Sequence, residues 1–187
     1  MWRRALPPAL AAVVLAGCGT KPPKTPDVTT PGPPIGFQRT AYPAAGISFD
    51  VPGGWRKVDG KPPLVAAVAT GTATVAVWRY PRTEPLPTTH AALAAAKASL
   101  VAAVAQRDPT FRLQQAQMRH LKGRRAIQVV GIGTVTGQRR RIRSTHVYSD
   151  HAELIIDEYA PPTVFDRVDK QVFLHVLHSL RLGKAKA

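Results

Sequence analysis

Apolar and polar residues alternate along many stretches between residues 37 and 159, a pattern that predicts β-strands with one buried face. Five short strands are expected first, over 37–42, 47–51, 55–58, 64–69 and 74–80. Four longer strands follow, over 111–120, 124–135, 138–148 and 151–159. Because short turns rich in glycine and polar residues separate most neighbours, these strands are expected to pair as hairpins.

The register of the last hairpin can be predicted from its charged side chains. With Ser149 and Asp150 as a two-residue loop, Arg141 faces Glu158 and His146 faces Glu153. Each favourable cross-strand pair of this kind contributes about 0.2–1 kcal/mol to a sheet. A slip of one residue would break both pairs and turn every side chain to the other face, so we expect this register.

Helical spacing of apolar residues replaces the alternation in the middle of the chain. The expected helix begins at Thr88 or Thr89, whose hydroxyl groups can cap it, and ends at Asp108-Pro109. Its apolar stripe consists of Leu93, Ala96, Leu100, Ala103 and Val104.

A second helix is expected after the last strand. Thr163 is the expected cap, and Asp166 stands three residues later, close to a capping box. The apolar stripe consists of Phe165, Val168, Val172, Val176 and Leu180, with Phe173 beside it.

The order of these elements predicts an α+β fold with a mostly antiparallel sheet and two amphipathic helices packed on it, because each helix must bury its apolar stripe. Residues 37–183 suffice for one domain with its own core, and residues 184–187 form a short basic tail. Neither an internal repeat nor a change in composition indicates a second domain.

The N-terminus has the pattern of a secretory signal. Arg3 and Arg4 precede 13 uncharged residues, from Ala5 to Gly17. A membrane-spanning helix needs about 20 apolar residues, so this stretch is too short to be an anchor helix. Residues 1–17 are therefore expected to be a signal peptide.

Cys18 is the only cysteine of the chain, so no disulfide can form within it. An ordinary cleavage site has small residues at −1 and −3, and Leu15 at −3 does not fit. The stretch Leu15-Ala16-Gly17-Cys18 resembles the bacterial lipobox instead. The resemblance implies that Cys18 is acylated with diacylglycerol and becomes the first residue, after export by the general secretory or the twin-arginine route.

Residues 18–36 join the acylated cysteine to the domain. Six of the eighteen residues from Gly19 to Gly36 are proline, and the stretch has too few apolar residues to fold. Proline-rich chain is extended, at about 3.1 Å per residue, so we expect a spacer between the membrane and residues 37–183.

The domain resembles the PsbP-like family, which includes many bacterial lipoproteins. The resemblance rests on Ile47-Ser48-Phe49 with Pro52 and Trp55, on Gly123 before a strand, and on Ser179-Leu180 at the end. It implies an α/β/α sandwich around an antiparallel sheet. These residues are of the packing and turn kind, so the resemblance carries no catalytic set.

Candidate chemistry is sparse. The glycines of 131–137 have the spacing G-x-G-x-x-x-G and precede a strand, whereas a dinucleotide loop precedes a helix. His175 and His178 could share a metal, but we expect surface histidines because no carboxylate on that helix face completes a site. His146 and Glu153 are expected to form an ion pair rather than half of a catalytic dyad. We therefore expect neither an enzyme nor a cofactor.

Basic residues are the unusual polar feature of this chain, whose formal net charge is +15. If the hairpins pair as expected, a candidate anion-binding patch gathers near one end of the sheet, and its residues are Arg124, Arg125, Arg139, Arg141 and Arg143. Nucleic acid is not an expected partner, because the protein is exported and no aromatic residues interleave with the arginines. Anionic lipid, wall polymer or an envelope protein would suit the patch. The alternative is a solvated arginine face that reflects an actinobacterial composition.

The sequence thus favours a lipoprotein on the extracytoplasmic face of the cell membrane, with a non-enzymatic binding or accessory domain. Two alternatives stay open. One is a basic docking module for anionic envelope lipid or polymer, and the other is an envelope enzyme that uses His146 and Glu153.

Overall fold

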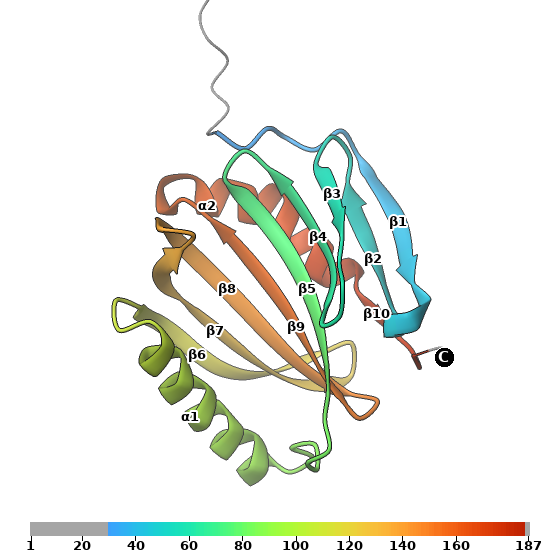
Figure 1. Ribbon diagram of the computed structural model, residues 1–187, viewed down its shortest axis with the longest axis vertical. Coiled ribbons are helices and arrows are strands. Elements are labelled where there is room, and N and C mark those ends of the chain that lie inside the picture. Colours follow the sequence, from blue (N-terminus) through green and yellow to red (C-terminus); the bar gives the residue numbers. More distant parts are fainter. Residues whose placement is uncertain (1–29, 186–187) are drawn as a thin grey trace, which may run out of the picture.

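The computed structural model describes residues 30–185, whose strands form two sheets (Figure 1). The large sheet has the order β3-β4-β5-β9-β8-β7-β6, and all its neighbouring strands are antiparallel. Its strands are β3 (Arg56–Asp59), β4 (Leu64–Thr70), β5 (Ala73–Pro81), β6 (Arg112–Leu121), β7 (Arg124–Val135), β8 (Gln138–Ser149) and β9 (Ala152–Ala160). The small sheet has the order β1-β2-β10, with β1 (Phe37–Tyr42), β2 (Ile47–Pro52) and β10 (Arg181–Leu182). A short 3-10 turn, η1 (Pro43–Ala45), joins β1 to β2.

A long-range strand pair connects the two series of hairpins. β5 pairs with β9, so that Val75 lies opposite Glu158 and Val77 opposite Ile156. Hairpin turns fix the other neighbours of the large sheet locally, but this pair depends on the whole domain closing around its core.

The first helix, α1 (His90–Arg107), begins where its cap was expected. The hydroxyl oxygen of Thr89 accepts a hydrogen bond from the backbone N–H of Ala92 at 3.1 Å, and the helix ends before Asp108. α1 lies beside β6 and β7, at one side of the large sheet (Figure 1).

The second helical segment consists of α2 (Pro162–Val168), the π-helical turn η2 (Asp169–Phe173) and α3 (Leu174–Ser179). Its expected stripe is confirmed, because all its members, from Phe165 to Leu180, are buried. The expected cap is wrong. Pro161 is the N-cap, Pro162 occupies the first helical position, where its missing N–H costs nothing, and Asp166 binds Arg141 instead.

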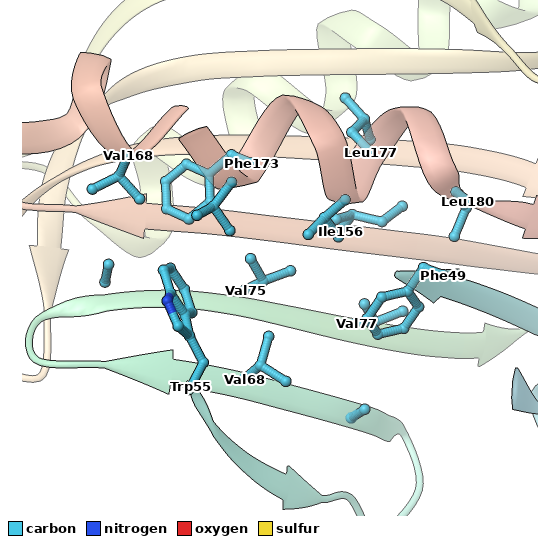
Figure 2. Close-up of a cluster of buried hydrophobic side chains, with 14 of the residues drawn as sticks. Phe49, Trp55, Val68, Val75, Val77, Ile156, Val168, Phe173, Leu177 and Leu180 are labelled. Atoms are coloured by element: carbon cyan, nitrogen blue, oxygen red, sulfur yellow. The ribbon is translucent and has the colours of Figure 1, made fainter. Parts of the chain in front are cut away.

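The main core lies between this second helical segment and one face of the large sheet (Figure 2). Phe49 and Trp55 close it from the side of the small sheet, and the indole of Trp55 meets the ring of Phe173 edge-on at 6.4 Å. A smaller cluster on the opposite face packs under α1. Helices on both faces of an antiparallel sheet confirm the expected α+β architecture.

The register expected for the last hairpin is wrong by one residue in each strand. Its turn consists of Asp150 and His151, which have φ values of 51° and 52°, and Ser149 pairs with Ala152. A tight turn with two left-handed residues matches the twist of the strands, and this preference outweighs the charge pairs. Because each strand shifts by one residue, the pairing changes by two positions in total, and every side chain stays on its expected face. Arg143, rather than Arg141, therefore lies opposite Glu158.

No helix within residues 30–185 is both long and apolar enough to cross a membrane. Cys18, the expected signal peptide and most of the expected spacer lie outside the described residues, so the structure does not test these predictions.

Candidate functional site

A groove of about 700 Å³ lies between the C-terminal half of α1 and the large sheet. α1 is anchored by Leu93, which is 2% exposed, whereas Leu100 and Val104 are only half-buried. The helix therefore covers β6 and β7, and the groove runs over the same face of β8, β9 and β5. A hollow of this size is typical of small-molecule sites.

Glycines of β7 shape the end of the groove near the helix terminus. A Cβ atom at Gly131 would lie 2.3 Å from Cζ of Phe111, and one at Gly133 would lie 2.9 Å from Oδ2 of Asp108. Both glycines thus make room for the segment that follows α1. The expectation that they belong to a strand and its turn is confirmed, since they lie within β7.

Cross-strand register places three rows of side chains on the open sheet face. Trp78, Ile155 and His146 form one row, and Thr74, Tyr159 and Ile142 form another. The middle row is Ala76, Asp157 and Ser144. Because its residues are small or polar, the middle row forms a polar depression between two rows that carry aromatic rings.

The polar side chains of this face form one continuous chain of contacts. The Nδ1 atom of His146 lies 2.8 Å from Oε1 of Glu153, and its Nε2 atom lies 3.0 Å from Oγ of Ser144. The hydroxyl of Ser144 also donates to Oδ1 of Asp157 at 2.6 Å. At the far end, Arg82 donates to Oε2 of Glu153 at 2.8 Å. We call these four linked residues, Glu153, His146, Ser144 and Asp157, the polar row. It runs across the cross-strand rows described above and is not one of them.

Glu153 is the fixed anion at one end of the polar row. Burial acts to raise the pKa of its carboxyl, but the hydrogen bonds and charges of His146 and Arg82 outweigh burial and hold the pKa below its usual value. Burial, followed by the charge of Glu153, raises the pKa of the neighbouring Tyr148. An ionised Glu153 accepts the Nδ1 hydrogen of His146, so the Nε2 atom is the one turned toward Ser144.

The distances within Ser144, His146 and Glu153 are those of a serine nucleophile, a base and an orienting carboxylate. Acyl transfer also needs N–H donors where the oxyanion forms. Ser144 lies in the middle of β8, and its neighbours in the strand pair with both β7 and β9. The backbone N–H groups around Ser144 therefore belong to the sheet ladders, and the geometry suits binding better than acyl transfer.

The structure does not bring the expected anion-binding patch together. Arg124 and Arg125 lie at the β6–β7 turn, whereas Arg139 pairs with Thr134 at the opposite end of β7. Arg143 is 7% exposed and forms ion pairs with Glu158 and Asp169, at 2.6 and 2.7 Å. The clustering failed because these arginines come from both ends of a long hairpin.

Arg141 is also engaged in a contact that the sequence did not predict. Its guanidinium donates to Asp166 at 2.8 Å and lies over the ring of Phe165, 4.9 Å from the centroid. Arg139 is therefore the one member of the expected group on β8 that is exposed.

The histidines of the last helix do not form a metal site in the part of the chain that the structure describes. His175 stacks on Phe37, with 3.8 Å between ring centroids, and lies 3.1 Å from Asp50. Within residues 30–185 no group of three His, Cys, Asp or Glu side chains could hold a metal ion.

Solved structures of other proteins share this architecture, although their sequences are very different. No protein-family model and no curated protein matches the sequence. The solution structure of cyanobacterial PsbP (CyanoP) from Synechocystis sp. PCC 6803 matches with a TM-score of 0.60 and 18% identity, over 79% of this chain and 95% of that chain. The fold is PsbP-like.

Two further solved structures share the PsbP-like fold. LpqN of Mycobacterium tuberculosis, a protein involved in cell envelope biogenesis, has a TM-score of 0.57 and 14% identity over 79% of this chain and 91% of its own. The Ran-binding protein Mog1p of Saccharomyces cerevisiae has a TM-score of 0.53 and 8% identity over 80% of this chain and 96% of its own. At these identities the likeness shows the fold alone.

Two residues of the polar row on this PsbP-like fold, Ser144 and Asp157, were not predicted from the sequence. The predicted contact between His146 and Glu153 exists, but the two are diagonal neighbours rather than a directly facing pair. The signal was present, since Ser144 precedes His146 by two residues on one face of a strand, and the actual register puts Asp157 opposite Ser144.

Proposed function

We propose that this protein is a lipid-anchored accessory protein of the extracytoplasmic face of the cell membrane, and that its PsbP-like domain binds a small ligand in the groove beneath α1. The groove carries the binding part of the proposal. It combines an apolar wall from α1 with a floor of buried and half-buried, hydrogen-bonded polar side chains, the combination found in ligand pockets.

The location rests on a separate line of support. The lipobox-like Leu15-Ala16-Gly17-Cys18 and the proline-rich residues that follow it suit a lipoprotein with a spacer. The structural likeness to LpqN, a protein involved in cell envelope biogenesis, is in keeping with the same compartment.

A photoreactive residue in the groove tests the binding function even when the ligand is unidentified. Ala103 of α1 lines the groove, whereas Ala102, which is turned about 100° around the helix from it, does not, so the two positions form a matched pair. With p-benzoylphenylalanine at position 103 in intact cells, irradiation is expected to give a small-molecule adduct by mass spectrometry. An equal adduct at position 102, or none at either position, would contradict the proposal.

A second candidate function is acyl transfer, favoured by the Ser144–His146–Glu153 geometry. A fluorophosphonate labels activated serine nucleophiles covalently. If Ser144 is a binding residue, the purified protein stays unlabelled. Labelling that disappears in Ser144→Ala would make the protein an enzyme instead.

A further inference from the structure

The polar row holds two carboxylates and one imidazole, so the number of hydrogens available for its contacts depends on whether His146 is protonated. Three contacts join Glu153, His146, Ser144 and Asp157. With both carboxylates ionised, a neutral imidazole supplies one hydrogen and the serine hydroxyl supplies one more. In that state one acceptor lacks a hydrogen, either Nε2 of His146 or an oxygen of Asp157, and one further hydrogen completes the contacts, either a second proton on the imidazole or the donor of a ligand.

The acceptor without a hydrogen lines the groove, since Ser144, His146 and Asp157 are all part of its wall. His146 is only 6% exposed, so water reaches its Nε2 atom poorly, whereas Ser144 and Asp157 are half-buried. A buried acceptor without a donor is costly, and a ligand that brings a hydrogen-bond donor removes this cost. In either protonation state of His146 the polar row has no spare hydrogen to donate, so it favours a ligand group that donates hydrogen bonds over one that accepts them.

The charge of the groove selects among donors. Apart from His146, the charged residues of its lining are Asp108, Asp157 and Arg107, so acidic groups are not outnumbered here in a chain that otherwise has a strong positive charge. Thr110 and Thr134 donate hydrogen bonds to Asp108, and these hold the pKa of its carboxyl below the usual value. Asp157 would repel an anionic ligand group, whereas it would attract a cationic hydrogen-bond donor.

Aromatic rings flank the same carboxylate. Asp157 lies between the row of Trp78 and the row of Tyr159, and both rings line the groove. The face of an indole or phenol ring attracts an ammonium group within about 6 Å. A carboxylate with aromatic neighbours therefore suits an organic ammonium ion.

We propose that the groove binds a primary ammonium ligand with an apolar body, whose ammonium group donates hydrogen bonds to the polar row at Asp157. With three N–H donors, one ammonium group can donate to the acceptor of the polar row that lacks a hydrogen and also to the second carboxylate oxygen of Asp157. The apolar body lies along Leu100, Val104, Phe111, Ile142 and Ile155, which line the remainder of the groove. This inference rests on the groove being the ligand site, as proposed above.

A set of ligands with one octyl chain and different polar groups tests the proposal on the wild-type protein. The set is octylammonium, octyltrimethylammonium, octyl glucoside and octyl sulfate, each below its micelle concentration, with titration calorimetry as the readout. Octylammonium is expected to bind about tenfold or more tightly than the other three, because only it carries both charge and N–H donors. Binding of octyl sulfate or octyl glucoside as tight as that of octylammonium would overturn the proposal.

Variants locate the binding. Asp157→Asn is expected to lower octylammonium affinity about tenfold or more, and Val104→Trp, which fills the half-buried part of the groove, to abolish it, while Ala102→Trp leaves it unchanged. Thermal melts show that each variant is folded. Unchanged affinity in a folded Asp157→Asn overturns the ammonium assignment. If the photoreactive residue at position 103 still captures a molecule, the groove remains the ligand site and only its chemistry is wrong.

Discussion

The guanidinium of Arg143 on β8 lies 2.6 Å from the carboxylate of Glu158 on β9, beneath the second helical segment. Glu158 has no exposed surface and its Oε1 atom has no hydrogen-bond partner, while Arg143 also reaches Asp169 at 2.7 Å. Asp169 opens the π-helical turn η2, so the ion pairs connect the sheet to the one irregular turn of the helix. Two charged strand residues are thus part of the interior rather than of a surface patch.

Removal of the arginine should be costly. Arg143→Met leaves Glu158 buried without its cation, and we expect a loss of about 3–5 kcal/mol in the free energy of unfolding at neutral pH. Urea denaturation measures the loss. Arg139→Met, on the exposed part of β8, is the control and should change stability by less than about 0.5 kcal/mol. The double variant Arg143→Met/Glu158→Leu should recover much of the loss; no recovery would mean that shape rather than charge matters.

Stability should also depend on pH through Glu158. Burial raises the pKa of its carboxyl from the ordinary 4.5 to about 7, although Arg143 opposes the rise. The native state therefore binds more protons than the unfolded state between these values, and its stability is expected to fall as pH rises from 4.5 to 7. Glu158→Gln should remove this part of the dependence of the unfolding free energy on pH. Parallel pH–stability curves for the two proteins would contradict the assignment.

Close packing of Phe111 on Gly131 predicts the effect of a single methyl group. In Gly131→Ala the new Cβ would meet Cζ of Phe111 at 2.3 Å, so the ring or the strand must move. We expect a loss of about 1–3 kcal/mol in unfolding free energy, measured by urea denaturation. Phe111→Leu is expected to reduce the cost of the second substitution, and strictly additive losses in the double variant would count against the contact.

Local chemistry explains which parts of the fold the sequence could predict. Hairpin strands such as β7 and β8 follow from alternation and from turn residues next to each other in the chain, for example Thr136 and Gly137, which have positive φ. The β5–β9 pair and the short strand β10 could not be predicted in this way. They pair residues far apart in the chain, which only the closed core brings together.

The candidate site was harder to predict than the fold because it depends on register and on incomplete helix packing. The stripe of α1 predicts a helix that is buried along its length, yet Leu93 is its one fully buried residue in the described structure. Whether such a stripe closes on the sheet depends on what lies beneath it. Phe111 and Asp108 occupy the space at the end of α1, so the groove remains open.

The single cysteine gives the clearest test of where the protein resides. Cys18→Ser removes the thiol that the lipobox-like stretch would present for acylation, so the variant should leave the membrane fraction or accumulate unprocessed. Fractionation and labelling with an alkyne analogue of palmitate measure both effects. Thr25→Ser, in the proline-rich spacer, is the matched control and should be processed and anchored normally. Stable anchoring takes two lipid signals or more. A Cys18→Ser protein that is processed to the same size as the wild type and still fractionates with membranes at high salt would rule out a lipid anchor at this residue.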